Sequence, residues 1–173
     1  MSIRTIYQYP APVLRKKAGK VNKFNEELKQ LIVDMAETMY DAPGIGLAAP
    51  QIGESIQLLV VDISKDADNK EYMAVINPKI TETEGTQIDE EGCLSVPDLT
   101  ANVNRHKKIT LEFQDPDGNN KTLVTEDRFA VVLQHEIDHL NGILFIDHLS
   151  PLKRNLYKKK IKKLLASQKM EVA

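Results

Sequence analysis

Hydrophobic side chains recur at helical spacing in two long segments of the chain. The first covers residues about 25–41, with Asn25 as a candidate N-cap, and its repeating positions are Leu28, Leu31, Ile32, Met35 and Met39. The second runs from Asp127 to Asn141 and is followed by Gly142, which suits the first position beyond a helix. We therefore predict two helices, one over residues about 25–41 and one over residues 127–141.

Strand-like patterns fill the region between these two helices. Three runs rich in β-forming residues come first: Ile56–Ile63, Tyr72–Asn77 ahead of Pro78, and the weakly alternating Lys79–Thr86. Ile109–Phe113 and Lys121–Val124 then flank Asp115-Pro116-Asp117-Gly118, a strong turn signal, and predict a hairpin. Because the strands are grouped between helices, the pattern predicts an α+β fold with mixed or antiparallel strands around the second helix.

A third, strongly basic helix is predicted at the C-terminus. Ser150 and Pro151 are suited to its N-cap and first helical position, and its apolar stripe is Leu152, Leu156, Ile161, Leu164 and Leu165. Residues 150–173 carry eight Lys or Arg and one Glu, whereas the remainder of the chain has a net charge of −9. A solvated face of an amphipathic helix explains such a run, and attraction to an RNA surface is the alternative.

Composition limits the class of protein. With 173 residues, 42% hydrophobic and 28% charged, the chain fits one globular domain that spans residues 1–173. The first residues contain no apolar signal region, and no apolar run approaches the length of a membrane span. A lone cysteine cannot form an intramolecular disulfide and is typical of a reducing compartment. We therefore expect a cytoplasmic protein without a membrane partner.

The sequence His135-Glu136-Ile137-Asp138-His139 lies within the second predicted helix. Helical geometry places the two imidazoles on one face, one turn apart, where they can hold one metal ion while Glu136 reaches a water bound to it. The motif is embedded in apolar residues, so these polar groups are expected to be buried and to need partners. The pattern predicts metal-assisted hydrolysis.

A third ligand can come from either side of this helix. His148 and Asp147 lie downstream, but the longer extended metalloprotease motif is absent. Upstream lies Cys93, the only cysteine, in the sequence Glu91-Gly92-Cys93-Leu94-Ser95. Two His and one Cys with an open position form a recognised catalytic set, although a free Cys is also commonly a small buried hydrophobe. Without such a context, His148 and His106 are expected to be surface or structural residues.

A segment rich in small residues, Gly44-Ile45-Gly46-Leu47-Ala48-Ala49-Pro50-Gln51-Ile52-Gly53, follows the first predicted helix. Because glycine and alanine have small side chains or none, a ligand can approach the backbone of this segment closely. No Lys-Ser/Thr follows the glycines, so the segment is not a phosphate-binding loop. The alternative is a helix end followed by an ordinary loop.

Taken together, the motifs G-I-G-L-A-A-P-Q, E-G-C-L-S and H-E-I-D-H, in this order and at these separations, resemble the peptide deformylase family over most of the chain. The resemblance implies a metal-dependent hydrolase that removes the N-terminal formyl group from formylmethionyl nascent polypeptides. The products would be formate and a peptide with a free N-terminal Met.

The resemblance also implies roles for individual residues. The metal ligands would be Cys93, His135 and His139. Glu136 would accept the proton of the attacking water and pass it to the leaving amine, and the oxyanion would be held by the Leu94 backbone N–H and the Gln51 amide. The substrate-binding positions would be Ile45, Gly46, Glu91, Val131 and Val132.

The metal and the partners are expected from the same resemblance. It implies one Fe²⁺ ion, whereas the His₂Cys donor set alone suits Zn²⁺, so Zn²⁺ or another divalent ion can take its place. The expected partners are N-formylmethionyl peptides and, through the basic C-terminal helix, the ribosome, with no DNA. Near the metal, Asp138 needs a cation, and Arg105 is the predicted partner because the resemblance brings it close.

Two other functions fit parts of the pattern. A zinc-dependent endopeptidase accounts for H-E-x-x-H alone, and it would tolerate loss of Cys93 if its third ligand lay downstream. A binding protein with a purely structural metal is the other alternative. A structural site usually closes all four positions with protein ligands, and the sequence offers three good ones.

Overall fold

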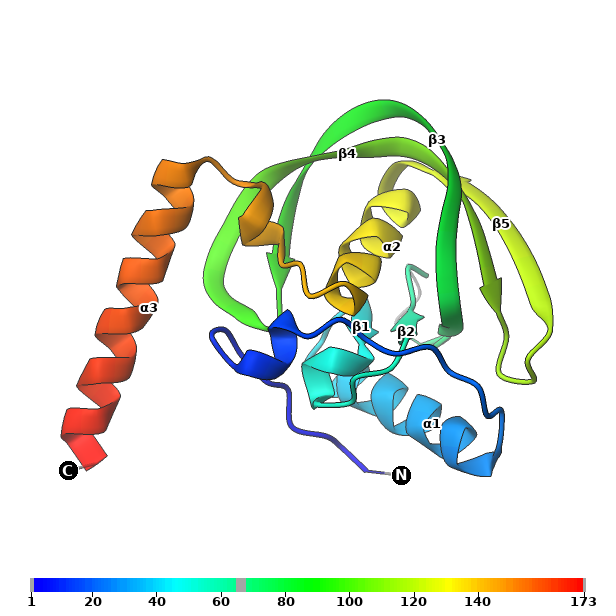
Figure 1. The fold of residues 1–173 in the computed structure, drawn as a ribbon, viewed down its shortest axis with the longest axis horizontal. Helices are drawn as coiled ribbons and strands as arrows, with labels where there is room; N and C mark the ends of the chain where they lie inside the picture. Colours follow the sequence, from blue (N-terminus) through cyan, green and yellow to red (C-terminus); the bar gives the residue numbers. More distant parts are fainter. Residues whose placement is uncertain (1, 65–67, 173) are drawn as a thin grey trace.

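The computed structural model describes residues 2–64 and 68–172 of the chain. Over these residues a five-stranded antiparallel sheet, in the order β1-β2-β3-β4-β5, bends around one central helix, α2 (Figure 1). The strands are β1 Gly46–Ala48, β2 Leu58–Val61, β3 Met73–Cys93, β4 Val96–Gln114 and β5 Asn120–Glu126. The helices are α1 Glu26–Asp41, α2 Asp127–Leu140 and α3 Pro151–Val172, with short 3₁₀ turns η1 Pro12–Arg15, η2 Ala49–Ile52 and η3 Phe145–His148. The predicted α+β class is confirmed.

Helix α1 forms as its sequence pattern predicts. The side chain of Asn25 caps it by accepting a hydrogen bond of 3.0 Å from the backbone N–H of Leu28. Its apolar stripe packs against β1 and β2. The helix ends at Asp41, and the chain then enters the small-residue segment that contains β1 and η2.

Strand β2 lies between two hydrophobic clusters, which is why its sequence is continuously apolar. Leu59 and Val61 pack into a cluster with α2, whereas Leu58 and Val60 pack into the cluster that contains α1. All four side chains are buried, and burial of such a side chain contributes about 1.5–3 kcal/mol relative to exposure. The strand therefore fixes the position of α2 relative to α1.

The predicted break at Pro78 is wrong, because β3 continues through it as one long strand. Pro78 has no N–H to donate, and pairing with β4 shifts register between Ile76 and Lys79. Asn77 adopts a left-handed φ of +52° at this bulge. Its side-chain amide donates to Val21 O at 2.8 Å and to Gln114 Oε1 at 2.7 Å. These bonds hold the irregular backbone, so the strand reaches Cys93 at its far end.

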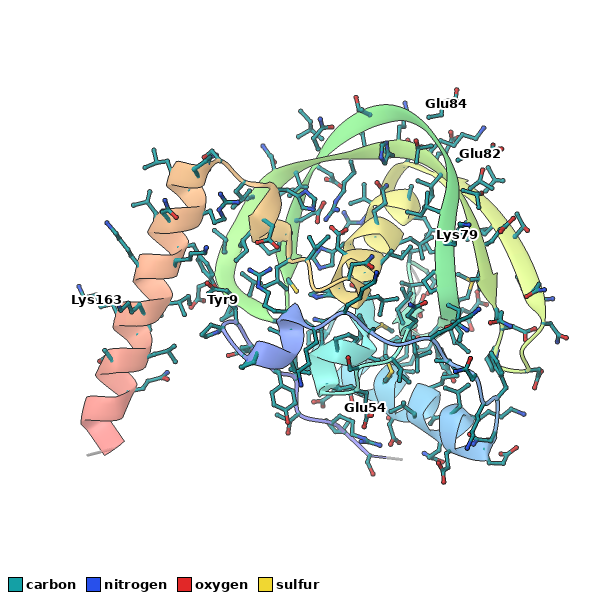
Figure 2. The ribbon with its side chains drawn as sticks, in the orientation of Figure 1. Tyr9, Glu54, Lys79, Glu82, Glu84 and Lys163 are labelled. Atoms are coloured by element: carbon teal, nitrogen blue, oxygen red, sulfur yellow. The ribbon has the colours of Figure 1, made fainter. Side chains whose placement is uncertain are left out.

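The hairpin of β4 and β5 is confirmed, although β4 begins far earlier than Ile109. β3 and β4 arch over α2 (Figure 1), and they are joined at Cys93 and Val96 by a turn of only two residues. At the exposed crest of this arch lie Glu82 and Glu84 (Figure 2). The lone cysteine is thus the last residue of a strand at a tight turn.

Helix α2 has the predicted start and stop. Gly142 follows it with a φ of +73°, and a methyl group there would lie 2.6 Å from the carbonyl oxygen of Arg15. Both the backbone angle and the close approach of η1 thus favour glycine at this position. Among the buried residues of α2 are Gln134, His135, Glu136 and His139, an unusual density of polar groups for an interior helix.

The predicted apolar stripe of α3 is largely wrong. Its inward residues are Tyr157 and Ile161, at 4% and 6% exposure, whereas Leu152 and Leu156 are 70% and 58% exposed. Leu164 and Leu165 are also exposed. The helix contacts the body over a narrow strip, where Tyr157 donates to Pro97 O at 3.0 Å and its ring centroid is 5.9 Å from that of Tyr9. Figure 2 shows Tyr9 on the side of the body that faces α3. Beyond that strip the helix projects from the body (Figure 1).

Candidate metal centre and active site

Cys93, His135 and His139 converge beneath the arch of β3 and β4. One potential ligand atom from each side chain lies within 4.8 Å of the other two. The Cys93 Sγ is 3.3 Å from His139 Nε2, and the two imidazole centroids are 5.1 Å apart. Their predicted convergence is confirmed, although α2 begins at Asp127, 34 residues after Cys93.

A buried arginine connects the strands to the helix beside these residues. Arg105 donates from Nε and Nη2 to the two carboxylate oxygens of Glu91, at 2.8 and 2.9 Å. Its Nη1 donates to Asp138 Oδ2 at 2.6 Å, so the predicted pair of Arg105 and Asp138 is confirmed. The inner Arg105–Glu91 pair has side chains that are each 5% exposed.

Glu91 has a role that the sequence did not reveal. Its Oε1 accepts a hydrogen bond of 2.9 Å from His135 Nδ1, which orients the opposite ring nitrogen toward Cys93 and His139. Burial alone would raise the pKa of Glu91, but the hydrogen bonds from Arg105 and His135 lower it to about 2. Glu91 is therefore an anion at any physiological pH, and it fixes the tautomer of His135.

Glu136 occupies a buried and incompletely bonded position. Its Oε2 has no hydrogen-bond partner among the described residues. A methyl group built at Gly46 would lie 2.6 Å from Oε1, so only glycine leaves room for this carboxylate. Burial raises the pKa of Glu136 to about 7, with His135 opposing the shift and Glu91 adding to it. Such a group can both accept and return a proton near neutral pH.

The amide of Gln51 is fixed in one orientation on η2. Its Oε1 accepts from the backbone N–H of Ala48 at 2.9 Å. The Nε2 therefore points toward the turn after β3, donating to Ser95 Oγ at 3.0 Å and lying 3.7 Å from Cys93 Sγ. Ser95 is fully buried, and its part in holding Gln51 carried no sequence signal.

A cavity of about 620 Å³ opens beside these groups. It is lined by Cys93, His135, Glu136, Gln51 and Leu94. All five predicted substrate positions line it as well: Ile45, Gly46, Glu91, Val131 and Val132. At its rim Arg128 pairs with Asp89 at 3.2 Å. The structure therefore brings every predicted site residue except His139 to the wall of one cavity. His139 lies behind this wall, with its ligand atom within 4.8 Å of those of Cys93 and His135.

The residues present fit a divalent metal ion. One thiol and two imidazoles surround one point, and Glu91 supports His135 as outer partners of metal-binding histidines do. Burial lowers the pKa of His139 well below its usual value, with His135 adding to the shift, so its ring is neutral as a ligand must be. Glu136 lines the same cavity as His135 and Cys93, and its unpartnered Oε2 is available to bond a water bound beside such an ion.

Comparison with known proteins agrees with this site. The family model described as Polypeptide deformylase matches residues 3–155. A peptide deformylase of Desulfotalea psychrophila is 63% identical over 164 residues, covering 94% of this chain and 97% of that protein. One from Acidobacterium capsulatum is 49% identical, covering 95% and 96%.

Solved structures give the same result. The crystal structure of a peptide deformylase from Legionella pneumophila matches with a TM-score of 0.88 and 47% identity, covering 96% of this chain and 98% of that one. A peptide deformylase of Ehrlichia chaffeensis in complex with actinonin matches with a TM-score of 0.88 and 34% identity, covering 94% and 98%. The resemblance seen in the three motifs is thus confirmed, and the chain belongs to the polypeptide deformylase family.

Proposed function

We propose that Cys93, His135 and His139 hold one divalent metal ion at which the chain hydrolyses the formyl amide of N-formylmethionyl polypeptides. As a peptide deformylase, the chain is a hydrolase that removes an N-terminal formyl group. The observation that carries the assignment of the site is the convergence of one thiol and two imidazoles at one point, beside a cavity that Cys93 and His135 line. Residues 1–173 would then act as a single catalytic unit.

The ion would supply Lewis-acid chemistry when bound: it lowers the pKa of a water in its open position and polarises the formyl oxygen. We propose Fe²⁺ as the physiological ion because the family resemblance implies it. The donor set by itself also suits Zn²⁺. Cys93 lines an open cavity, so an iron-loaded protein should lose activity in air as the thiolate and the ion are oxidised.

Glu136 is suited to carry the proton. It would accept a proton from the attacking water and pass it to the leaving amine, which is the general-base and general-acid role of one group. Its buried, unpartnered Oε2 and a pKa of about 7 support this role. Gly46 lines the same cavity and, having no side chain, leaves room for this carboxylate.

Gln51 and Leu94 are suited to stabilise the oxyanion. The Gln51 side chain is anchored by Ala48, so its N–H₂ group faces the Cys93 turn without needing to reorganise during the reaction. Leu94 follows Cys93 in the same turn and lines the cavity. The Gln51 amide and the Leu94 backbone N–H could therefore donate hydrogen bonds to the negative charge that develops on the formyl oxygen.

The cavity wall is suited to an extended peptide with an apolar first side chain. Val131 and Val132 of α2 and Ile45 supply apolar surface, and Gly46 opens β1, the edge strand of the sheet. A peptide could add to that free edge by backbone hydrogen bonds. Glu91 contributes to the wall, but both of its carboxylate oxygens are bonded to Arg105. We therefore propose a packing contact for Glu91 and not a polar one.

We further propose that α3 docks the enzyme on the ribosome. The helix projects from the body (Figure 1), and its exposed lysines include Lys158, Lys159, Lys160, Lys162 and Lys163. The exposed Leu152 and Leu156 add apolar surface to it. Ribosomal RNA would supply the phosphates. Because nascent chains are made in the cytoplasm, we propose the same location for this protein. No helix in the described residues is long and apolar enough to cross a membrane.

The first test is formate release from a formyl-Met peptide by protein purified and loaded with Fe²⁺ without oxygen. Wild-type protein should release formate. Cys93→Ala should lose both activity and tightly bound metal, because two imidazoles alone hold an ion weakly. His106→Ala, which removes an imidazole outside the metal site, should keep both. No formate from the wild type would refute the activity, and full metal retention by Cys93→Ala would refute the third ligand.

A second test concerns Glu136. Glu136→Gln should bind metal like the wild type but lower kcat by about 10²–10⁴-fold, because the amide cannot carry the proton. The matched control is Glu90→Gln, which neutralises a carboxylate at the rim of the same cavity and should stay near wild-type kcat. The measurement is the initial rate at saturating peptide. If Glu136→Gln turns over at nearly the wild-type rate, the proposed role of Glu136 is contradicted.

The third test concerns α3. Replacing Lys158, Lys159, Lys162 and Lys163 with Gln should weaken binding to purified ribosomes and reduce the salt dependence of that binding, because fewer counterions are released. Activity on a short formyl peptide should not change. The control replaces the four exposed lysines Lys16, Lys17, Lys20 and Lys23. Equal ribosome affinity of the two variants would leave α3 as a solvated helix.

A further inference from the structure

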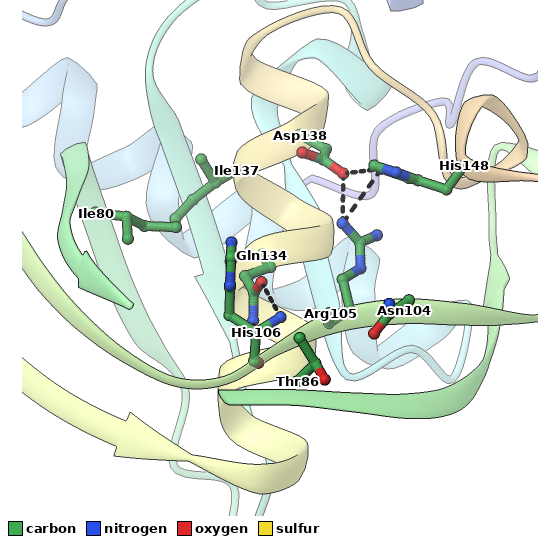
Figure 3. A pocket seen from close by; sticks show the side chains of 9 residues that line it. All are labelled: Ile80, Thr86, Asn104, Arg105, His106, Gln134, Ile137, Asp138 and His148. Carbon is green, nitrogen blue, oxygen red and sulfur yellow. Dashed lines mark hydrogen bonds and ion pairs between the residues drawn. The ribbon is translucent and has the colours of Figure 1, made fainter. Parts of the chain in front are cut away.

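A second cavity, of about 340 Å³, lies beside α2 (Figure 3). It is lined by other residues of that helix than those that line the catalytic cavity. Gln134 and Asp138 line it from the helix, one turn apart, whereas His135 lines the catalytic cavity. The two cavities share no lining residue. Arg105 and His148 also line the second cavity, so one end of the arginine network opens into it.

A continuous series of hydrogen bonds runs from this cavity to the metal site. His148 Nε2 lies 2.8 Å from Asp138 Oδ2, and the same oxygen accepts from Arg105 Nη1 at 2.6 Å (Figure 3). Arg105 binds Glu91 through two further donors. Glu91 accepts in turn from His135 Nδ1 at 2.9 Å. Four successive contacts thus join an outer imidazole to a candidate metal ligand.

The four residues beyond His135 differ in burial, and His148 is the most exposed of them. Arg105 and Glu91 are almost fully buried, Asp138 is 20% exposed and His148 is 36% exposed. A carboxylate beside a guanidinium accepts hydrogen bonds only, so the Nε2 of His148 donates to Asp138. Arg105 Nη1 lies 3.4 Å from the same nitrogen, so the imidazole and the guanidinium meet at one carboxylate oxygen. His148 therefore restricts where Asp138, and through it Arg105, can lie.

His148 is itself held on a firm support. It ends η3, in which Phe145 packs its ring 6.1 Å from the ring of His135. The neighbouring Asp147 accepts from the Leu144 backbone N–H at 3.0 Å and from Arg15 at 2.6 Å. The segment that carries His148 is therefore fastened to α2 through the ring contact with His135, and to η1 through Arg15. A fixed donor of this kind can position a carboxylate.

The geometry points to His148 as a positioning residue for the metal ligand His135, acting through Asp138, Arg105 and Glu91. This inference rests on the proposed role of His135 in binding the ion. Residues that orient metal-binding histidines typically change metal affinity or activity by about 10–100-fold when replaced. Because His148 acts through three intermediates, we expect an effect at the lower end of that range.

The test compares three variants loaded with Zn²⁺ as the probe ion. His148→Ala removes the donor, and His148→Gln retains an N–H donor. His106→Ala is the matched control, because its imidazole lines the same cavity while only its backbone bonds to Gln134. The readouts are the rate of Zn²⁺ loss to an excess of a chromogenic chelator, the absorption bands of the Co²⁺-loaded proteins, and Tm.

His148→Ala should release Zn²⁺ about 10-fold faster than the wild type, and its Co²⁺ bands should shift. His148→Gln should recover a slow rate, and His106→Ala should match the wild type. A wild-type release rate for His148→Ala, or equal acceleration in His106→Ala, would overturn the inference. So would a fast rate in His148→Gln at an unchanged Tm.

Cys93→Ala, measured in parallel, separates this inference from the proposed function. If Zn²⁺ retention depends on Cys93 but not on His148, the metal site stands and the positioning role falls. If retention does not depend on Cys93, the proposed metal site fails, and the role of His148 in positioning its ligand fails with it.

Discussion

Arg105 lies between two carboxylates, one on the strand that ends at Cys93 and one on the helix that carries both histidines. Glu91 precedes Cys93 by two residues, so fixing Glu91 against His135 also fixes where the thiol can lie. Removing such charges from water is costly, and a buried ion pair is weak evidence for stability. The contribution of Arg105 here is geometric, because its two ion pairs hold β3 and α2 in one relative position. A metal site with one ligand on β3 and two on α2 requires such a fixed position.

The residues proposed to carry out the reaction and the residues that hold α2 in place lie on different faces of that helix. Residues that face the larger cavity would bind the ion, move the proton and contact the peptide, whereas Gln134 and Asp138 fasten the helix to β4. Gln134 bonds both backbone groups of His106, at 3.0 and 2.9 Å. A helix held at two points one turn apart cannot rotate freely about its axis. This keeps the imidazoles of His135 and His139 directed at Cys93.

Short sequence patterns correctly predicted those features whose physical cause lies within a few neighbouring residues. The i,i+4 spacing of His135 and His139, the Asn25 cap and the turn at Gly118 each have a physical cause within a few residues, and all occur in the structure. The lone Cys93, in its Gly-containing sequence, was a candidate third ligand from the residue pattern, but that pattern left downstream ligands open, and the choice of Cys93 was strengthened by the family resemblance.

What the sequence could not provide depends on distant contacts. The continuation of β3 past Pro78 requires Asn77 to bond Val21 and Gln114. The exposed leucines of α3 follow from how narrowly that helix meets the body, which periodicity does not encode. His148 was expected to be a surface or structural residue, but its sequence did not show that it bonds Asp138 in the series that ends at His135.

The central claim is that one thiolate and two imidazoles hold the catalytic ion. X-ray absorption spectroscopy at the iron edge, on protein loaded with Fe²⁺ without oxygen, measures the elements bound to the ion directly. We predict one sulfur and two imidazole nitrogens, completed by oxygen, and loss of the sulfur contribution in Cys93→Ser. A shell of nitrogen and oxygen alone in the active wild-type enzyme would contradict the account.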